Sequence, residues 1–195
     1  MNTTKKVVCC ALLCGAVSLS PSRIFAATDD DKKFLATAAQ SDVNEIKLSQ
    51  LAVQKTSNPT VKAFAEKMVT EHKQMSAGMK PFAESWGLTP PADLDDDHKD
   101  VYKKLSDLSG ADFDKEYISQ MVSDHSKALD AFTKEAKDTQ DAKFRAAVIE
   151  GKTKVAAHKN MAYDLKRSYR PNVNLKVTES HAALNAAWDS SIRRE

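Results

Sequence analysis

The pentapeptide Met68-Val69-Thr70-Glu71-His72 returns later in the chain as Met121-Val122-Ser123-Asp124-His125. The two polar changes, Thr to Ser and Glu to Asp, keep the chemistry of the side chain. An aromatic residue stands four positions before each copy, Phe64 in the first and Tyr117 in the second. The interval between the copies is long enough for one helix and a long connection. The repeat therefore predicts a duplicated helical unit, each copy of which carries an acid–His pair.

Apolar residues around both copies recur at helical spacing, and no segment alternates as a strand would. The predicted elements are four long helices, one short helix before the third of them, and one short helix near the C-terminus. They cover about residues 31–56, 59–86, 101–108, 109–137, 141–169 and 178–192. Long helices with one apolar face and short connections predict an all-α four-helix bundle.

The N-terminal segment has the pattern of a secretory signal. Lys5 and Lys6 precede an apolar stretch over 7–19, and the small residues Ala26 and Ala27 offer a cleavage site. A membrane anchor is the alternative, but the apolar stretch is short for a spanning helix. We therefore expect a signal peptide over 1–26, a bundle domain over 27–170 and a tail over 171–195. The protein would be exported, either to the periplasm or beyond it, with no transmembrane segment in the mature chain.

Removal of the signal changes the composition that matters for function. All three cysteines lie within it, so the mature chain would have no disulfide and no thiolate ligand. Lys5, Lys6 and Arg23 are lost with it, which leaves 26 basic and 27 acidic side chains of the original 29 and 27. A nearly neutral chain of this kind does not predict nucleic-acid binding.

The acid–His pairs admit a metal-binding hypothesis. One ionisable residue falls on or beside the apolar face of each long helix, and imidazoles and carboxylates together bind zinc, iron, manganese or copper. The candidate metal ligands are Glu45, Glu71, His72, Asp124, His125 and His158. Adjacent residues on a helix point about 100° apart, so Glu71 is expected to flank His72 rather than share its direction. A divalent transition metal is the ion such a cluster would bind, although the fold itself requires no cofactor.

Other features favour a structural role for the same residues. A di-iron carboxylate site needs Glu three positions before its His, and this chain has Val69, Val122 and Val155 there. Buried acid–His pairs also satisfy each other and can fix the register of two helices. A third interpretation is a Cu(I) site, because Met68, Met75 and Met79 share a helix face with His72. His98 and His181 are expected to be exposed.

The quoted residues resemble a known bacterial family. The resemblance rests on Lys33-Phe34, Ala38-Ala39, Glu45 and Leu51-Ala52, on the segment Val61–His72, and on the segment Phe113–His125. Over about residues 31–169, the chain resembles domain-of-unknown-function family 4142. The resemblance implies an exported, ferritin-like bundle, often labelled an outer membrane protein, with no established activity.

These observations favour a non-enzymatic role, because no hydrolase, phosphate-loop or dinucleotide-binding motif is present. We expect an exported binding or envelope-stress protein whose acid–His pairs are mainly structural. The alternative is a metal-binding or metal-oxidising ferritin-like protein. The partner is unknown. A protein bound through Trp188 and Ile192 of the tail, or a second copy of the chain, would be compatible with the sequence.

Overall fold

The structure is a computed structural model that describes residues 27–169. The expected signal peptide and C-terminal helix lie outside these residues. The described chain forms five helices: α1 (Asp29–Lys55), α2 (Pro59–Ser85), α3 (Asp96–Asp107), α4 (Gly110–Asp138) and α5 (Ala142–Ser168). The expectation of an all-α four-helix bundle with a short helix in the central connection is confirmed.

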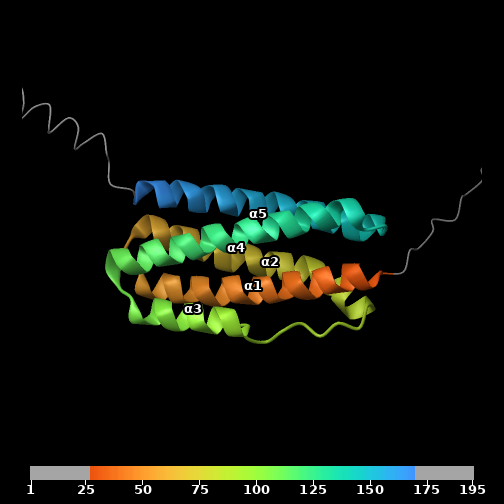
Figure 1. Ribbon diagram of the computed structural model, residues 1–195, viewed down its shortest axis with the longest axis horizontal. Helices are drawn as coiled ribbons and strands as arrows, with labels where there is room; N and C mark the ends of the chain where they lie inside the picture. The colour runs from red at the N-terminus through yellow and green to blue at the C-terminus, as the bar shows by residue number, and fades with distance from the viewer. Residues whose placement is uncertain (1–26, 170–195) are drawn as a thin grey trace, which may run out of the picture.

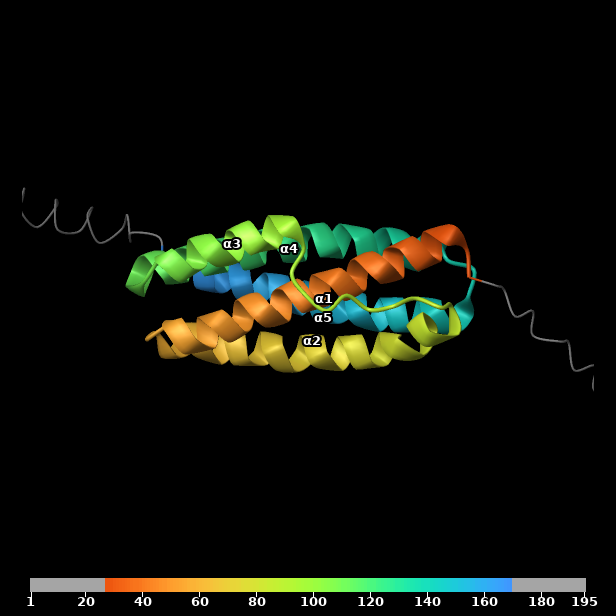
Figure 2. The ribbon, with the colours of Figure 1, turned by 90° about the horizontal axis from the view of Figure 1, so that it is seen from below.

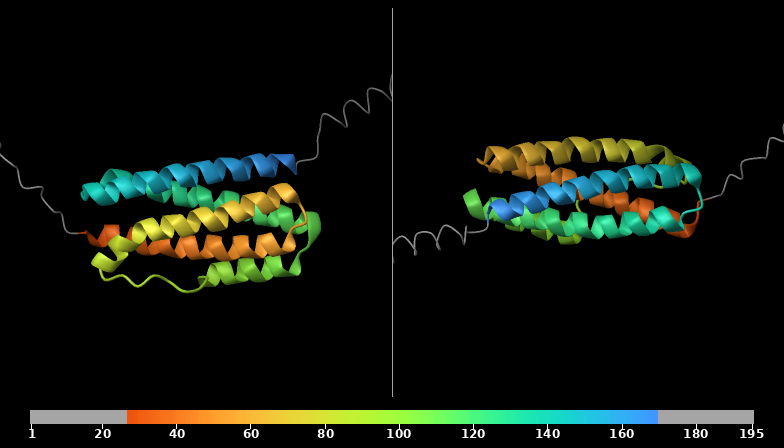
Figure 3. Two further views of the ribbon diagram at one scale, coloured as in Figure 1. Left: turned by 180° about the vertical axis from the view of Figure 1, so that it is seen from behind. Right: turned by 90° about the horizontal axis from the view of Figure 1, so that it is seen from above.

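The four long helices lie side by side, and a long connection returns along the bundle between α2 and α3 (Figure 1). Helix α1 packs chiefly on α2, and α4 packs chiefly on α5. Contacts between α1 and α4 and between α2 and α5 join these two hairpins. Because the connection runs the length of the bundle, α2 and α4 point in the same direction, as in ferritin-like folds with one long crossover. Figure 3 (left) shows the bundle from behind the view of Figure 1, where α2 and α5 lie together on the face towards the viewer.

Helix boundaries follow from local side-chain chemistry. Thr28 and Asp31 form a capping box, so α1 begins at Asp29, two residues earlier than the spacing predicted. Asn58 caps α2 with Pro59 at its first position, and Asp141 caps α5.

The start of the short helix differs from the prediction, which placed it at about residue 101. Asp95 caps α3 and accepts a hydrogen bond from the backbone N–H of His98. Asp96 and Asp97 form the first helical turn, where negative charge favours the helix dipole. The short helix consequently begins earlier than its apolar residues indicated.

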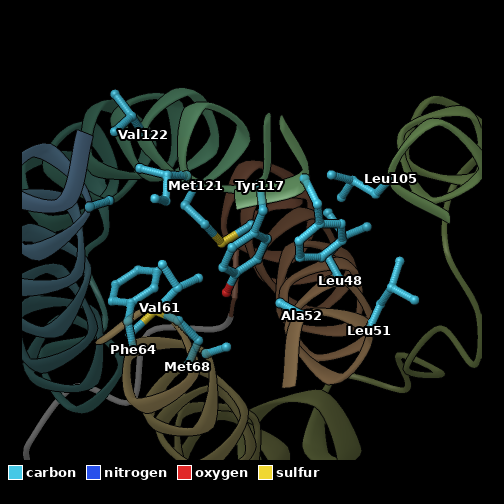
Figure 4. Close-up of a cluster of buried hydrophobic side chains, with 14 residues drawn as sticks. Leu48, Leu51, Ala52, Val61, Phe64, Met68, Leu105, Tyr117, Met121 and Val122 are labelled. Carbon is cyan, nitrogen blue, oxygen red and sulfur yellow. The ribbon is translucent and has the colours of Figure 1, made fainter. Parts of the chain in front are cut away.

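Two apolar clusters fill the bundle. The first includes Leu48, Met68, Tyr117 and Met121, and Figure 4 shows Tyr117 in the middle of it. The second includes Leu35, Met75, Phe132, Phe144, Val148 and Val155. Along every long helix, one to three buried polar residues separate the positions that belong to the two clusters. The bundle therefore has a polar layer across its middle.

Gly151 of α5 permits close packing in the second cluster. A Cβ atom there would lie 2.5 Å from the ring of Phe132, whereas a Cβ at Gly78 in α2 would meet nothing within 4 Å. We predict that Gly151→Ala destabilises the protein by about 1 kcal/mol, since overpacking outweighs the gain in helix propensity. The matched Gly78→Ala variant should gain about 0.5–1 kcal/mol. Urea unfolding of both variants measures the difference, and equal stabilisation of both would contradict the packing argument.

Glu135 near the end of α4 should make stability depend on pH. Burial and the neighbouring Asp31 together raise the pKa of this carboxyl to about 7. The folded state therefore holds a proton that the unfolded chain loses near pH 4.5, so this group's contribution to stability is lost as the pH rises towards 7. We predict that wild-type protein loses melting temperature between pH 5 and 8 relative to Glu135→Gln. If the two melting temperatures differ by the same amount at every pH, Glu135 does not have this role.

Candidate metal centre

Three histidines from three different helices converge in the polar layer. His72 of α2, His125 of α4 and His158 of α5 are each at most 2% exposed, and their ring centroids lie 5.2–5.4 Å apart. One nitrogen from each ring lies within 4.8 Å of the other two. The structure thus brings together the three histidines that the sequence singled out.

The predicted carboxylates occupy different places around this triad. Glu45 of α1 is 3% exposed, and its Oε1 lies 3.6 Å from Nδ1 of His125. Glu71 reaches from α2 to α5, where its Oε2 lies 2.5 Å from Nε2 of His158. Asp124 contacts none of the three histidines. It accepts a hydrogen bond from Gln120 and lies 3.5 Å from Nε2 of His98.

Each histidine of the triad has one ring nitrogen bound to an oxygen outside the triad. Nδ1 of His72 lies 2.8 Å from Oδ1 of Asp42, and Nδ1 of His125 lies 2.8 Å from the Met121 carbonyl. Nε2 of His158 has Glu71 as its partner. Because a carbonyl and carboxylates accept hydrogen bonds, these three nitrogens carry the protons, and the other three present lone pairs.

Asp42 is a functional candidate that the sequence analysis missed. It lies on α1, is 6% exposed, and accepts a second hydrogen bond from the Ser76 hydroxyl. The available signal was its position one helical turn before Glu45, which places both on neighbouring parts of one face.

The nitrogens left free lie close together and are poorly satisfied. Nε2 of His72 and Nε2 of His125 are 3.3 Å apart. Nδ1 of His158 is buried without a hydrogen-bond partner, and so is Oε2 of Glu45. Buried polar atoms are nearly always paired, so an unpaired atom on each of two residues of the polar layer is consistent with a ligand site there.

Burial favours the neutral form of two histidines of the triad. Burial and the neighbouring His72 and His158 together lower the pKa of His125 to about 3. Burial also lowers the pKa of His158 to about 4, although Glu71 opposes this. The pKa of Glu71 falls to about 2, because hydrogen bonds from Lys67 and His158 outweigh its own burial. Neutral imidazoles oriented by carboxylates are the usual form of metal-binding histidine.

The pKa of the buried Glu45 shifts upward, whereas those of His125, His158 and Glu71 shift downward. Desolvation, with Asp124 and Asp42 nearby, raises the pKa of its carboxyl well above the usual range. A cavity of about 10 Å³ lies beside it and is lined also by His72, Met75 and His125. The donors available around this cavity are therefore imidazole, carboxyl and thioether.

His98 is not exposed as the sequence predicted. It is half-buried, with Nδ1 2.7 Å from Oδ1 of Asp95 and 3.0 Å from Nδ2 of Asn44. Contact with Asp124 raises its pKa against the effect of burial, and Asp95 adds to the rise. The sequence missed this cluster because the long connection decides where α3 lies against α1.

Comparisons with solved structures agree with the fold. CopM in its Cu(I)-bound form aligns with a TM-score of 0.62 and 18% identity, over 75% of this chain and 100% of that one. A DUF305 protein from Streptomyces coelicolor aligns with a TM-score of 0.60 and 13% identity, over 70% of this chain and 90% of that one. A DUF305 fragment from Deinococcus radiodurans aligns with a TM-score of 0.60 and 15% identity, over 72% of this chain and 98% of that one.

Sequence comparison gives the family. No curated protein matches the chain. Among residues 27–169, no helix has a stretch apolar enough to cross a bilayer. The domain of unknown function DUF4142 matches residues 18–165, which is most of the chain. This protein therefore belongs to the DUF4142 family.

Proposed function

We propose that the protein binds one transition-metal ion between His72, His125 and His158, and that Cu(I) is the ion that fits best. The observation that carries the proposal is the orientation of the three imidazoles. Each has one nitrogen bound to an outer acceptor, which leaves its second nitrogen for an ion.

The spacing of two of the free nitrogens agrees with a shared ion. Two nitrogens bonded to one ion at about 2.0–2.1 Å lie about 3.3–3.5 Å apart. The Nε2 atoms of His72 and His125 are 3.3 Å apart. Two lone pairs at this distance repel unless a cation lies between them, and burial makes a proton unfavourable there. A metal ion would therefore relieve an arrangement that the apo protein holds at a cost.

The donor set favours a soft ion. Imidazole suits copper and zinc, whereas magnesium and calcium require oxygen ligands. Zinc normally takes four ligands, but the cavity of about 10 Å³ leaves little room for a water. Cu(I) is stable with three ligands, and the Met75 thioether lines the same cavity. These features favour Cu(I), with Glu45 as the fourth ligand if zinc binds instead.

The acid–His pairs have a structural role in this proposal as well. Asp42 joins α1 to His72 of α2, and Glu71 joins α2 to His158 of α5. The same contacts that hold the helices together orient the imidazoles. The likeness to CopM, which was crystallised with Cu(I), Cu(II) and silver, supports the choice of metal through the shared fold.

Binding rather than catalysis is the role we propose. The site is enclosed, and an ion in it would have no open position for a substrate. Such a protein would hold or carry copper in the cell envelope, which is consistent with the binding or stress role that the sequence favours.

Metal binding can be tested with the full chain, in which Cys9, Cys10 and Cys14 are replaced by serine so that thiols do not compete. We expect one Cu(I) per chain in anaerobic competition with bicinchoninate. His72→Asn and His125→Asn each keep the outward Nδ1-type donor, and His158→Gln keeps the Nε2-type donor. Each should weaken binding by more than about 100-fold, since even the loss of an outer partner costs 10- to 100-fold.

Two further variants separate the candidate ions. Met75→Leu should weaken Cu(I) binding and leave zinc binding unchanged, whereas Glu45→Gln should do the opposite. The metal-free melting temperature of each variant controls for damage to the fold. Stoichiometric Cu(I) binding that persists in the His72→Asn/His125→Asn double variant would exclude this site.

We also propose that the chain is exported after removal of 1–26. The support is the sequence pattern, with Lys5 and Lys6 before an apolar stretch and small residues at 26 and 27. The mass of protein recovered from the cell envelope should correspond to cleavage after Ala26 or Ala27. An uncleaved N-terminus on envelope protein would favour the membrane-anchor alternative.

A further inference from the structure

A second polar cluster lies outside the triad, at the surface. Helix α3 contacts both α1 and α4 and covers one end of the face between them (Figure 2). Next to it, a groove of about 490 Å³ is open to solvent. Its polar lining includes Asn44, Asp95, His98 and Asp124, from the facing sides of α1, α3 and α4.

Two atoms of this cluster have the spacing of a pair of metal ligands. Nε2 of His98 and Oδ2 of Asp124 are 3.5 Å apart, close to the separation of about 3.3–3.5 Å expected for two ligands of one ion. Asp95 binds Nδ1 of the same ring and so orients Nε2. Asn44 in turn donates to the Asp95 carboxylate at 2.7 Å. The cluster offers two ligands on an oriented support, which suits weak and exchangeable binding.

The groove shares its floor with the small cavity at the triad. Ala38, Ser41, Ala128 and Phe132 line both. Three of these residues are small, so little side-chain volume separates the groove from the inner cavity. Glu45 lines the inner cavity one helical turn beyond Ser41, and its Oε2 is buried without a partner. The inner cavity therefore offers an oxygen ligand beside the imidazoles of His72 and His125, which line it as well.

We infer that the groove between α1 and α4 is the route by which metal reaches the histidine triad, with His98 and Asp124 as the outer site where the cation first binds. This inference rests on the proposed function. The ion exchanges ligands along the route, from His98 and Asp124 to Glu45 and then to His72 and His125, and no electron is transferred. A buried site needs such a route, because the triad itself is at most 2% exposed.

The charges at the groove act in opposite directions. Asp95 and Asp124 attract a cation, whereas Lys127, which also lines the groove and is exposed, repels it. Loading should therefore respond with opposite sign to the removal of an acid and the removal of this lysine.

The test measures loading rate and affinity separately, in the full chain with its three cysteines replaced by serine. Cu(I) is supplied as its acetonitrile complex, and unbound Cu(I) is trapped with bicinchoninate at successive times. The variant His98→Asn/Asp124→Asn keeps the hydrogen bonds to Asp95 and Gln120 but removes the two outer ligands. We expect its loading rate to fall about 10- to 100-fold, as for other electrostatically guided associations.

Equilibrium affinity in that variant should stay within about fivefold, since the two residues are not ligands of the final site. Dissociation should therefore slow along with loading. Lys127→Gln should load faster than wild type. Asp93→Asn is the matched control, because it removes one acidic charge at an exposed position that pairs with Lys47 outside the groove.

The outcomes separate this inference from the proposed function. If wild type binds one Cu(I) and the double variant loads at the wild-type rate, the inferred route is wrong, but the proposed binding site at the triad is unaffected. If the double variant loses stoichiometric binding, His98 and Asp124 belong to the final site and the route is again wrong. If wild type binds no Cu(I), the proposed function and the route fail together.

Discussion

The polar layer across the middle of the bundle is the constraint on which the rest of the structure depends. Three imidazoles and two carboxylates, those of Asp42 and Glu45, are almost fully buried between two apolar clusters, where an unpaired polar group is costly. The acceptors of Asp42, Met121 and Glu71 each satisfy one imidazole nitrogen. A shift of α1, α2 or α5 by one residue would break the contact of Asp42 with His72 or that of Glu71 with His158. The layer therefore fixes the register of these three helices, which the apolar clusters alone would leave less well defined.

The same layer explains why structural and functional interpretations of the acid–His pairs are compatible. An outer acceptor that satisfies one nitrogen necessarily turns the other towards the centre of the bundle. The free nitrogens of His72 and His125 lie 3.3 Å apart, and the free nitrogen of His158 has no partner among the described residues. The protein is thus held in a state that a soft cation would stabilise, and the surrounding helices oppose any relaxation of the rings. Stability and metal affinity would be linked through the same contacts.

Much of the fold could be predicted from spacing. The apolar stripe of α5, from Phe144 through Val148 and Val155 to Ala162, is buried along its whole length. Helices α2 and α5 begin at or within one residue of the predicted positions. The sequence analysis predicted that α1 and α3 begin later in the chain than they do. The capping side chains of Thr28 and Asp95 extend these helices beyond their first apolar residues. Local hydrogen bonds of this kind leave little trace in a hydrophobic pattern.

Sequence alone was sufficient for the family, through the resemblance of particular segments. It was also sufficient for the all-α bundle and for the three histidines, because helical periodicity shows which residues face the core. It could not show that Asp124, an acid of the repeated phrase, faces His98 while its counterpart Glu71 faces His158. It also could not identify Asp42, or the groove that joins the surface cluster to the triad. These features depend on the rotation of each helix and on the path of the long connection. Contacts between residues 30 to 87 positions apart determine both, and no local pattern encodes them.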